Sequence, residues 1–395
     1  MDAVTNLCGI SARPRSVFAL AAGLLLAALS SGAPLAAQQP KYEELPLDTR
    51  LDDERSTLHR EIKTLVAKIH RGDTPLEPDA GKFDAWYTRY LFPKMTQISN
   101  LAEIPTLRQR FLQSDLERSS SQAAHDRLVR LTLTNMQAVA QGNYHPAARH
   151  NAMLIIGELN GREAIRVGNA QPPLPYVDAV NVMLEELESE TQIDAVRVAA
   201  LIGLLRHVEL DRMRPSDQRM PEAGRVRFLE RMLAIASAPP PAGRSPEGHA
   251  WMQRRAVQII GELGSPGAEN AAVVALRKLA ADNAQPLDLR TQAAESLGKI
   301  IYPTLPAETG AQMASELALV LHASCKAELD RLMREKKEEE EYKKRLALLG
   351  GGGNVKSERD GFRGLPGSGS QNEGTNPEKL LQWANVRAAG DRRSG

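Results

Sequence analysis

The feature that most constrains the fold is a nine-residue pattern that occurs four times in register between residues 149 and 298. It places Arg first, Ala three residues later, an aliphatic residue seven later and Gly eight later. Residues 149–157 and 290–298 match it in full, 253–261 begins with Gln, and 197–205 ends with Leu. Because Gly costs a helix about 1 kcal/mol relative to Ala, a recurring helical Gly indicates close packing. The residues at these positions are Arg149, Ala152, Gly157, Arg197, Ala200, Ala256, Gly261, Arg290, Ala293 and Gly298.

Helical periodicity divides this region into four pairs of helices, and the pattern falls in the second helix of each pair. Clusters of Gly, Pro and Asn separate the helices, and no stretch shows strand alternation flanked by hairpin signals. A single pair cannot bury its apolar face alone, so we expect neighbouring pairs to stack around one continuous core. The expected pairs are 125–142 with 146–159, 176–190 with 194–207, 224–238 with 248–263, and 268–282 with 287–302.

This pattern resembles the HEAT repeat, including the HEAT-like variants of many bacterial proteins, over residues 122–302. The resemblance implies an all-α protein of the α-α superhelix (armadillo-type solenoid) class, in which Ala lets neighbouring helices approach and Gly relieves crowding. It also implies an extended surface that holds other proteins. HEAT units usually span about 40–47 residues. Because the intervals here are irregular, we expect the segments after Gly161 and Ala238 to be loops between units.

Residues 1–37 have the organisation of a secretory signal peptide. Arg13 and Arg15 precede an apolar run over 17–29, and small residues follow up to Ala37. That run is shorter than the roughly 20 residues of a spanning helix. The sequence therefore predicts export to the periplasm or outside the cell, with no stable membrane insertion. An uncleaved leader that serves as an anchor is the alternative.

An aromatic cluster marks the N-terminal part of the mature chain, where we expect a linker over 38–50 and a helical cap over 51–121. The segment 83–92 contains five of the 16 aromatic residues, and Pro93 is expected to end its helix. The preferred interpretation is a hydrophobic cap on the end of the repeat stack. The alternative is an exposed platform for a glycan, peptidoglycan or peptide, with Trp86 and Tyr87 as the candidate interaction residues.

In the C-terminal third, the sequence predicts one long helix within 303–349 and a disordered tail over 350–395. The second half of the helix carries Glu and Lys or Arg four residues apart, which is typical of a solvated helix. A segment that binds a partner is the alternative. Within the Gly-rich tail, 377–389 has a helix-start signal and contains Leu380, Leu381 and Trp383. This short helix either docks into a groove or folds back on its own chain.

Charge and motifs exclude several function classes. Without the leader the chain has 48 basic and 48 acidic residues, and it lacks the basic excess of a nucleic-acid binder. Cys325 is the single cysteine that remains, so no internal disulfide is expected. We find no signature of a metal site, a nucleophile elbow or a phosphate-binding loop, and we predict neither a cofactor nor enzymatic activity.

The sequence thus predicts a non-catalytic scaffold of the cell envelope that binds a protein partner through HEAT-like repeats. The partner and the oligomeric state are left open. Two alternatives belong to other classes: a glycan-binding module that uses the 83–92 aromatics, and a lyase-like accessory subunit, by analogy with HEAT-like proteins that resemble bilin lyases.

Overall fold

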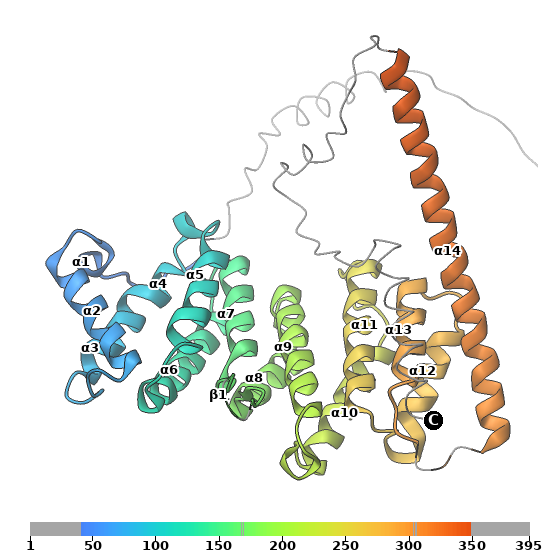
Figure 1. Ribbon diagram of the computed structural model, residues 1–395, viewed down its shortest axis with the longest axis horizontal. Coiled ribbons are helices and arrows are strands. Elements are labelled where there is room, and N and C mark those ends of the chain that lie inside the picture. Colours follow the sequence, from blue (N-terminus) through green and yellow to red (C-terminus); the bar gives the residue numbers. More distant parts are fainter. Residues whose placement is uncertain (1–40, 167, 169, 303, 305, 349–395) are drawn as a thin grey trace, which may run out of the picture. The chain divides into compact units, whose positions relative to one another are not determined.

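The computed structural model describes residues 41–348 except 167, 169, 303 and 305, and it is mostly helical (Figure 1). The prediction of an all-α protein is confirmed. The chain divides into two units, residues 1–325 and 326–395, which are described separately below. The predicted leader and the C-terminal tail lie outside the described residues.

The N-terminal cap consists of short helices and single turns. Ser56 begins the longest of them, α2, by accepting a hydrogen bond from the His59 N–H, and Gly72 ends it in the left-handed conformation at φ 80°. The elements are α1 (Thr49–Asp52), α2 (Thr57–Arg71), α3 (Ala80–Trp86), a π turn (Tyr87–Leu91), α4 (Phe92–Lys94), a 3-10 turn (Ile98–Asn100), α5 (Ile104–Arg110) and a second π turn (Phe111–Leu116).

Pro93 does not end the aromatic helix, contrary to the prediction. The chain widens into the π turn Tyr87–Leu91 and continues through Pro93 as α4 up to Lys94. Proline lacks an N–H, and the wider turn immediately before it accommodates the missing hydrogen bond.

The four predicted helix pairs are present, with ends that differ by a few residues from the expected ones. Three starts show side-chain caps: Ser121, His145 and Ser245 each accept a hydrogen bond from a backbone N–H of the first turn. The pairs are α6 (Gln122–Gln141) with α7 (Pro146–Glu158), α8 (Val177–Glu188) with α9 (Asp194–Arg212), α10 (Glu222–Ser237) with α11 (Pro246–Leu263), and α12 (Ala271–Ala281) with α13 (Leu287–Leu297).

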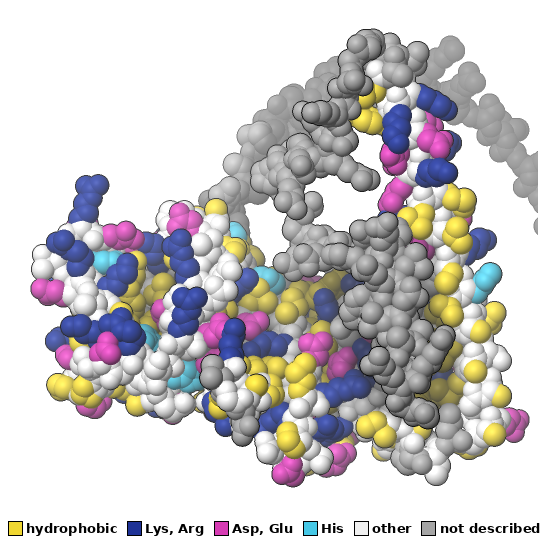
Figure 2. Space-filling model, viewed as in Figure 1, with side chains coloured by type: hydrophobic (Ala, Val, Ile, Leu, Met, Phe, Trp, Pro, Cys, Tyr) yellow, Lys and Arg dark blue, Asp and Glu magenta, His cyan; other side chains and the backbone are white. Residues whose placement is uncertain are grey.

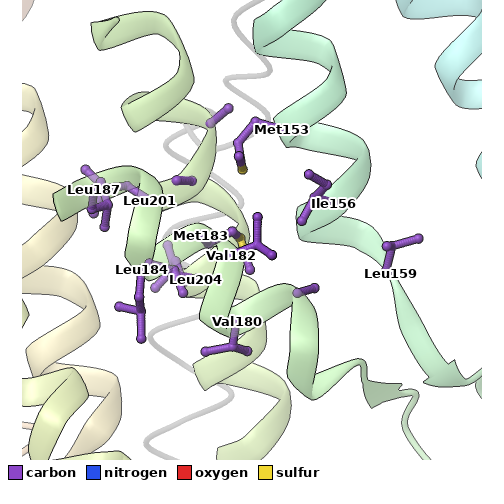
Figure 3. Close-up of a cluster of buried hydrophobic side chains, with 14 of the residues drawn as sticks. Met153, Ile156, Leu159, Val180, Val182, Met183, Leu184, Leu187, Leu201 and Leu204 are labelled. Atoms are coloured by element: carbon purple, nitrogen blue, oxygen red, sulfur yellow. The ribbon is translucent and has the colours of Figure 1, made fainter. Parts of the chain in front are cut away.

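The second helices form the spine of the first unit. Each first helix packs on the second helix of its own pair, and α7, α9, α11 and α13 contact one another in sequence order (Figure 1). The buried apolar side chains join into one continuous core that extends from Leu51 to Val320. Figure 3 shows a part of this core, where α7, α8 and α9 meet around Met153, Met183 and Leu204. Consecutive pairs therefore bury their apolar faces against each other, as the repeat pattern predicts.

The two predicted insertions are both loops. The first contains a small antiparallel ladder between β1 (Asn160–Arg162) and β2 (Leu174–Pro175), which the sequence did not predict. Strands of three and two residues are too short to show the alternation on which strand prediction rests. Two short 3-10 turns, Ser216–Gln218 and Ala268–Asn270, precede α10 and α12.

The long C-terminal helix, α14, spans Ala307–Leu348 and so lies within the predicted segment 303–349. Gly310 is tolerated in its first turn, where its N–H donates to the Pro306 carbonyl. Within the first unit, α14 buries Met313 and Val320, and Glu316 forms a two-pronged ion pair with Arg277 at 2.6 and 2.9 Å. No helix in the described part of the chain is both long enough and apolar enough to cross a bilayer.

Candidate functional site

The first residue of the repeated pattern caps the helix that precedes it in the pair. In all four pairs its side chain donates a hydrogen bond to a backbone carbonyl at the C-terminal end of the first helix. The pairs are Arg149 Nε with Ala140 O (2.9 Å), Arg197 Nη2 with Ser189 O (2.6 Å), Gln253 Nε2 with Ala236 O (3.1 Å) and Arg290 Nε with Ala280 O (3.1 Å). These carbonyls have no partner within their own helix, and a cation near a helix C-terminus is favourable. The polar residue of the pattern is therefore structural.

Arg149 also belongs to a buried polar network at the end of the first two pairs. Its Nη2 atom donates to Gln192 Oε1 at 2.6 Å, and the Gln192 amide donates to the carboxylate of Glu186. Gln141 Nε2 donates to the other Glu186 oxygen at 2.6 Å. Glu186 is only 2% exposed, so these donors compensate the burial of its charge. The network therefore joins Gln141 of α6 and Arg149 of α7 to Glu186 of α8.

The alanines of the pattern are buried, as predicted, at the contacts between second helices. The glycine role is confirmed at Gly157, where a Cβ atom would lie 2.7 Å from the Cα of Gly203 in α9. A Cβ on Gly203 would lie 2.6 Å from the Cα of Gly157 and 2.5 Å from the sulfur of Met183. The sequence pattern did not single out Gly203, because it occupies the sixth position after Arg197. The four alanines are Ala152, Ala200, Ala256 and Ala293, with at most 2% exposure.

The same register recurs between α11 and α13. A Cβ on Gly261 would lie 2.7 Å from Ser296 Oγ and 2.9 Å from Ser296 Cα. Ser296 is again the sixth position after the first residue of its pattern, and its hydroxyl donates to the Val257 carbonyl at 2.9 Å. The prediction is wrong for Gly298, which is exposed and whose added Cβ would come no closer than 3.3 Å to the Glu295 carbonyl. Gly298 follows the last second helix, α13, so no further pair approaches it.

The aromatic cluster lies inside the N-terminal cap. Tyr87 is fully buried and Trp86 is 8% exposed. Their rings pack against His59, His70, Phe83 and Tyr90 with centroid separations of 4.6–6.2 Å. A platform for a glycan needs exposed ring faces. The assignment of Trp86 and Tyr87 as interaction residues is therefore wrong, and the hydrophobic cap is what the structure shows.

A polar relay crosses the core of this cap. The Tyr87 hydroxyl lies 2.7 Å from His70 Nε2 and donates to Asp115 Oδ2 at 3.3 Å, while His70 Nδ1 lies 3.0 Å from Ser119 Oγ. Burial lowers the pKa of His70 to about 4, with a smaller effect from His125, and raises the pKa of Asp115 to about 6. Burial also raises the pKa of Tyr87 well above its ordinary value. These hydrogen bonds connect α2, through His70, with the first π turn, through Tyr87, and the second, through Asp115. The central residue, Tyr87, is shielded from solvent.

Groups that could carry other chemistry are dispersed. No cluster of three or more His, Cys, Asp or Glu side chains that could hold a metal ion occurs among the described residues. Cys325 is exposed on α14, and His322, one turn before it, is exposed as well. The candidate docking residues Leu380, Leu381 and Trp383 lie outside the described residues.

No family model matches this chain. Comparisons with curated proteins and with solved structures give no match either. The resemblance to HEAT repeats therefore rests on the residues of the pattern alone.

The remaining candidate is an exposed apolar surface on α14. In the second unit, Leu329, Leu332 and Met333 are 57%, 47% and 57% exposed. They lie within one turn of each other on the helix, so their side chains can form one patch. We refer to these three side chains as the α14 patch.

Proposed function

We propose that this protein is an exported, non-catalytic interaction scaffold, and that it binds a partner protein through the α14 patch. The observation that carries the proposal is the exposure of Leu329, Leu332 and Met333 in the second unit's part of α14, where most of the other side chains are charged. Contiguous exposed apolar side chains with a polar rim are typical of protein-interaction sites. Figure 2 shows apolar side chains at the surface along α14, between charged ones.

The helix around the patch is stabilised without a partner. Arg331 pairs with Glu328 and Glu335, and Lys343 pairs with Glu339 at 2.7 Å. Such pairs three or four residues apart stabilise an exposed helix by roughly 0.2–0.5 kcal/mol each. A preformed amphipathic helix loses less conformational entropy when it enters the apolar groove of a partner. The charged side chains beside the patch, such as Arg331 and Glu335, would then select a partner with complementary charges.

The repeats support a structural role for the rest of the described chain. The four polar residues of the pattern cap helices, and the Gly157–Gly203 contact holds two helix pairs together. The glycan-binding alternative loses its basis with the burial of Trp86 and Tyr87. No observation favours the lyase-like alternative.

Affinity capture from the cell envelope tests the proposal. The bait is the full chain, and the test variant replaces the patch by Leu329→Lys, Leu332→Lys and Met333→Lys. The matched control carries Ile98→Lys and Val274→Lys, two apolar residues that are 48% and 62% exposed elsewhere. We expect one stoichiometric protein to be captured by the wild type and the control and lost with the test variant.

A second bait that ends at Gly350 separates the patch from the tail. If the patch binds the partner, this shortened chain retains it. Loss of the partner on shortening, together with retention by the patch variant, would assign binding to the segment around Leu380 and contradict the proposal.

A further inference from the structure

The α14 patch is the start of a longer stripe along one face of the helix. In a coiled coil, the side chains that face the other helix recur at alternating steps of three and four residues. Counted from Leu329 in such steps, the stripe ends at Leu346, and all of its side chains are exposed. We call it the α14 stripe. It consists of Leu329, Leu332, Lys336, Glu339, Lys343 and Leu346.

The α14 stripe is apolar at both ends and charged in the middle. Leu329 and Leu346, at its ends, are 57% and 48% exposed. Lys336 makes no hydrogen bond or ion pair with any residue in the described part of the chain. Glu339 pairs with Lys343 of its own helix at 2.7 Å. Within a single chain the stripe therefore has neither a cover for its leucines nor a counter-charge for its central lysine.

A second copy of the helix can cover the stripe in two directions, of which the parallel one is unfavourable. In a parallel pair in register, each residue of the stripe faces its own counterpart. Lys336, Glu339 and Lys343 would then each oppose a like charge, and like charges at such short range repel. The parallel pair is therefore repulsive at the centre of the stripe.

The antiparallel direction removes these repulsions. When the pair is centred between Lys337 and Glu338, Lys336 of each copy faces Glu339 of the other. Because a two-fold axis repeats every contact, this pair of opposite charges forms twice. The charges at the centre of the stripe therefore favour one direction and one register.

The same register also joins the apolar ends of the stripe. Leu329 of each copy faces Leu346 of the other. Leu332 faces Lys343, whose methylene chain can cover the leucine while its ammonium group stays in water. One register thus matches the leucines and the charges together, so the stripe is complementary to itself.

We infer that the partner at the α14 patch is a second copy of this chain, which pairs with it antiparallel over residues 329–346. The inference rests on the proposed function and identifies its partner. Met333, the third residue of the patch, lies beside the stripe and gains partial cover. The paired segment is about 26 Å long, which is short for a coiled coil. We therefore expect a reversible dimer with a dissociation constant in the micromolar range.

Sedimentation equilibrium of the full chain measures this association. We expect a monomer at low concentration and a dimer at high concentration, with no larger species, because a two-fold contact closes on itself. The patch variant with Leu329→Lys, Leu332→Lys and Met333→Lys should stay monomeric. The matched control with Ile98→Lys and Val274→Lys should dimerise as the wild type does.

Charge reversal at the centre of the stripe tests the register. Lys336→Glu places a glutamate opposite Glu339 of the second copy, twice in the dimer, and should raise the dissociation constant about tenfold or more. Addition of Glu339→Lys restores opposite charges and should recover most of the affinity. The matched control is Lys337→Glu, which changes the net charge equally and lies on the outer face of the helix in this register. It should dimerise as the wild type does. Circular dichroism confirms that the variants have equal helix content.

Disulfide crosslinking reports the direction of the pair. In chains that carry Cys8→Ser and Cys325→Ser, Leu329→Cys is introduced in one version and Leu346→Cys in another. Oxidation of an equimolar mixture should give a covalent dimer that joins position 329 to position 346. Neither version alone should give one, whereas a parallel pair would crosslink within each version.

Four results would overturn the inference. They are a monomer at every concentration up to about 1 mM, no recovery of affinity in the double charge reversal, no crosslinked dimer from the mixture, and crosslinked dimers within one version.

Failure of the inference is distinguishable from failure of the proposed function. If the inference is right, a tagged bait captures the untagged copy of this chain from the cell envelope. A monomeric chain whose patch captures a different protein would refute the inference and leave the proposed function standing. A monomeric chain that captures no protein would refute both.

Discussion

Gly157 of α7 and Gly203 of α9 face each other so closely that a Cβ atom on Gly203 would lie 2.6 Å from the Cα of Gly157. Real Cβ atoms do not approach backbone atoms at such a distance, so the two helices must separate if either glycine gains a side chain. This contact explains why α7 carries, at this position, a residue that weakens helices.

Gly157→Ala should therefore destabilise the protein by about 1–3 kcal/mol, as overpacking of a close contact does. Chemical denaturation followed by circular dichroism gives this difference. The matched control is Gly81→Ala in α3, where an added Cβ would meet nothing within 4 Å. That substitution should leave stability unchanged or raise it by up to about 1 kcal/mol. Equal effects of the two substitutions would show that the α7–α9 contact is not tight.

Arg290→Met should cost about 1 kcal/mol, because it removes the hydrogen bond to the Ala280 carbonyl and the cation at the C-terminus of α12. Hydrogen exchange at the last turn of α12 should speed up in this variant. Arg110→Met, at an exposed residue of α5, serves as the control and should leave exchange in α12 unchanged. Unchanged exchange in the Arg290 variant would contradict the capping role of the pattern.

Asp115→Asn should stabilise the protein at neutral pH by about 1–3 kcal/mol and have little effect below pH 4. Burial raises the pKa of Asp115 from 3.8 to about 6. The folded state thus holds the proton more tightly than the unfolded chain, and the wild type loses stability as the pH rises from about 4 to about 6. The asparagine avoids this loss and can still accept from Tyr87. Melting temperatures at pH 4 and pH 7.5 measure the difference, and a stabilisation of equal size at both values would contradict it.

The signal-peptide prediction concerns residues 1–37, which lie outside the described part of the chain. Expression in a Gram-negative host, followed by cell fractionation and N-terminal sequencing, should give a periplasmic protein that begins at Gln38. A full-length protein in the membrane fraction would support the uncleaved anchor. A full-length protein in the cytoplasm would contradict export.

The sequence predicted the helix pairs and the close packing at Gly157 and Gly261, because apolar periodicity and a costly glycine are local signals. It did not reveal the capping role of Arg149 and its equivalents, since an Arg at a helix start has many possible partners.

The burial of Trp86 could not be predicted either. Aromatic residues along one face of a helix give the same sequence pattern in a core and on a binding surface. Sequence reasoning also missed a pocket of about 410 Å³ between α8, α9 and α10. Its walls come from three helices and a loop, and only their packing brings Val180, His207 and Phe228 together.

Site-specific photocrosslinking in envelope preparations tests the scaffold proposal most directly. A photoreactive amino acid replaces Leu332 in the α14 patch in one version of the protein and Val274 in another; both residues are exposed, at 47% and 62%. We expect a single crosslinked product of defined mass from position 332 and none from position 274. The absence of a product at position 332, or the same products from both positions, would contradict the account.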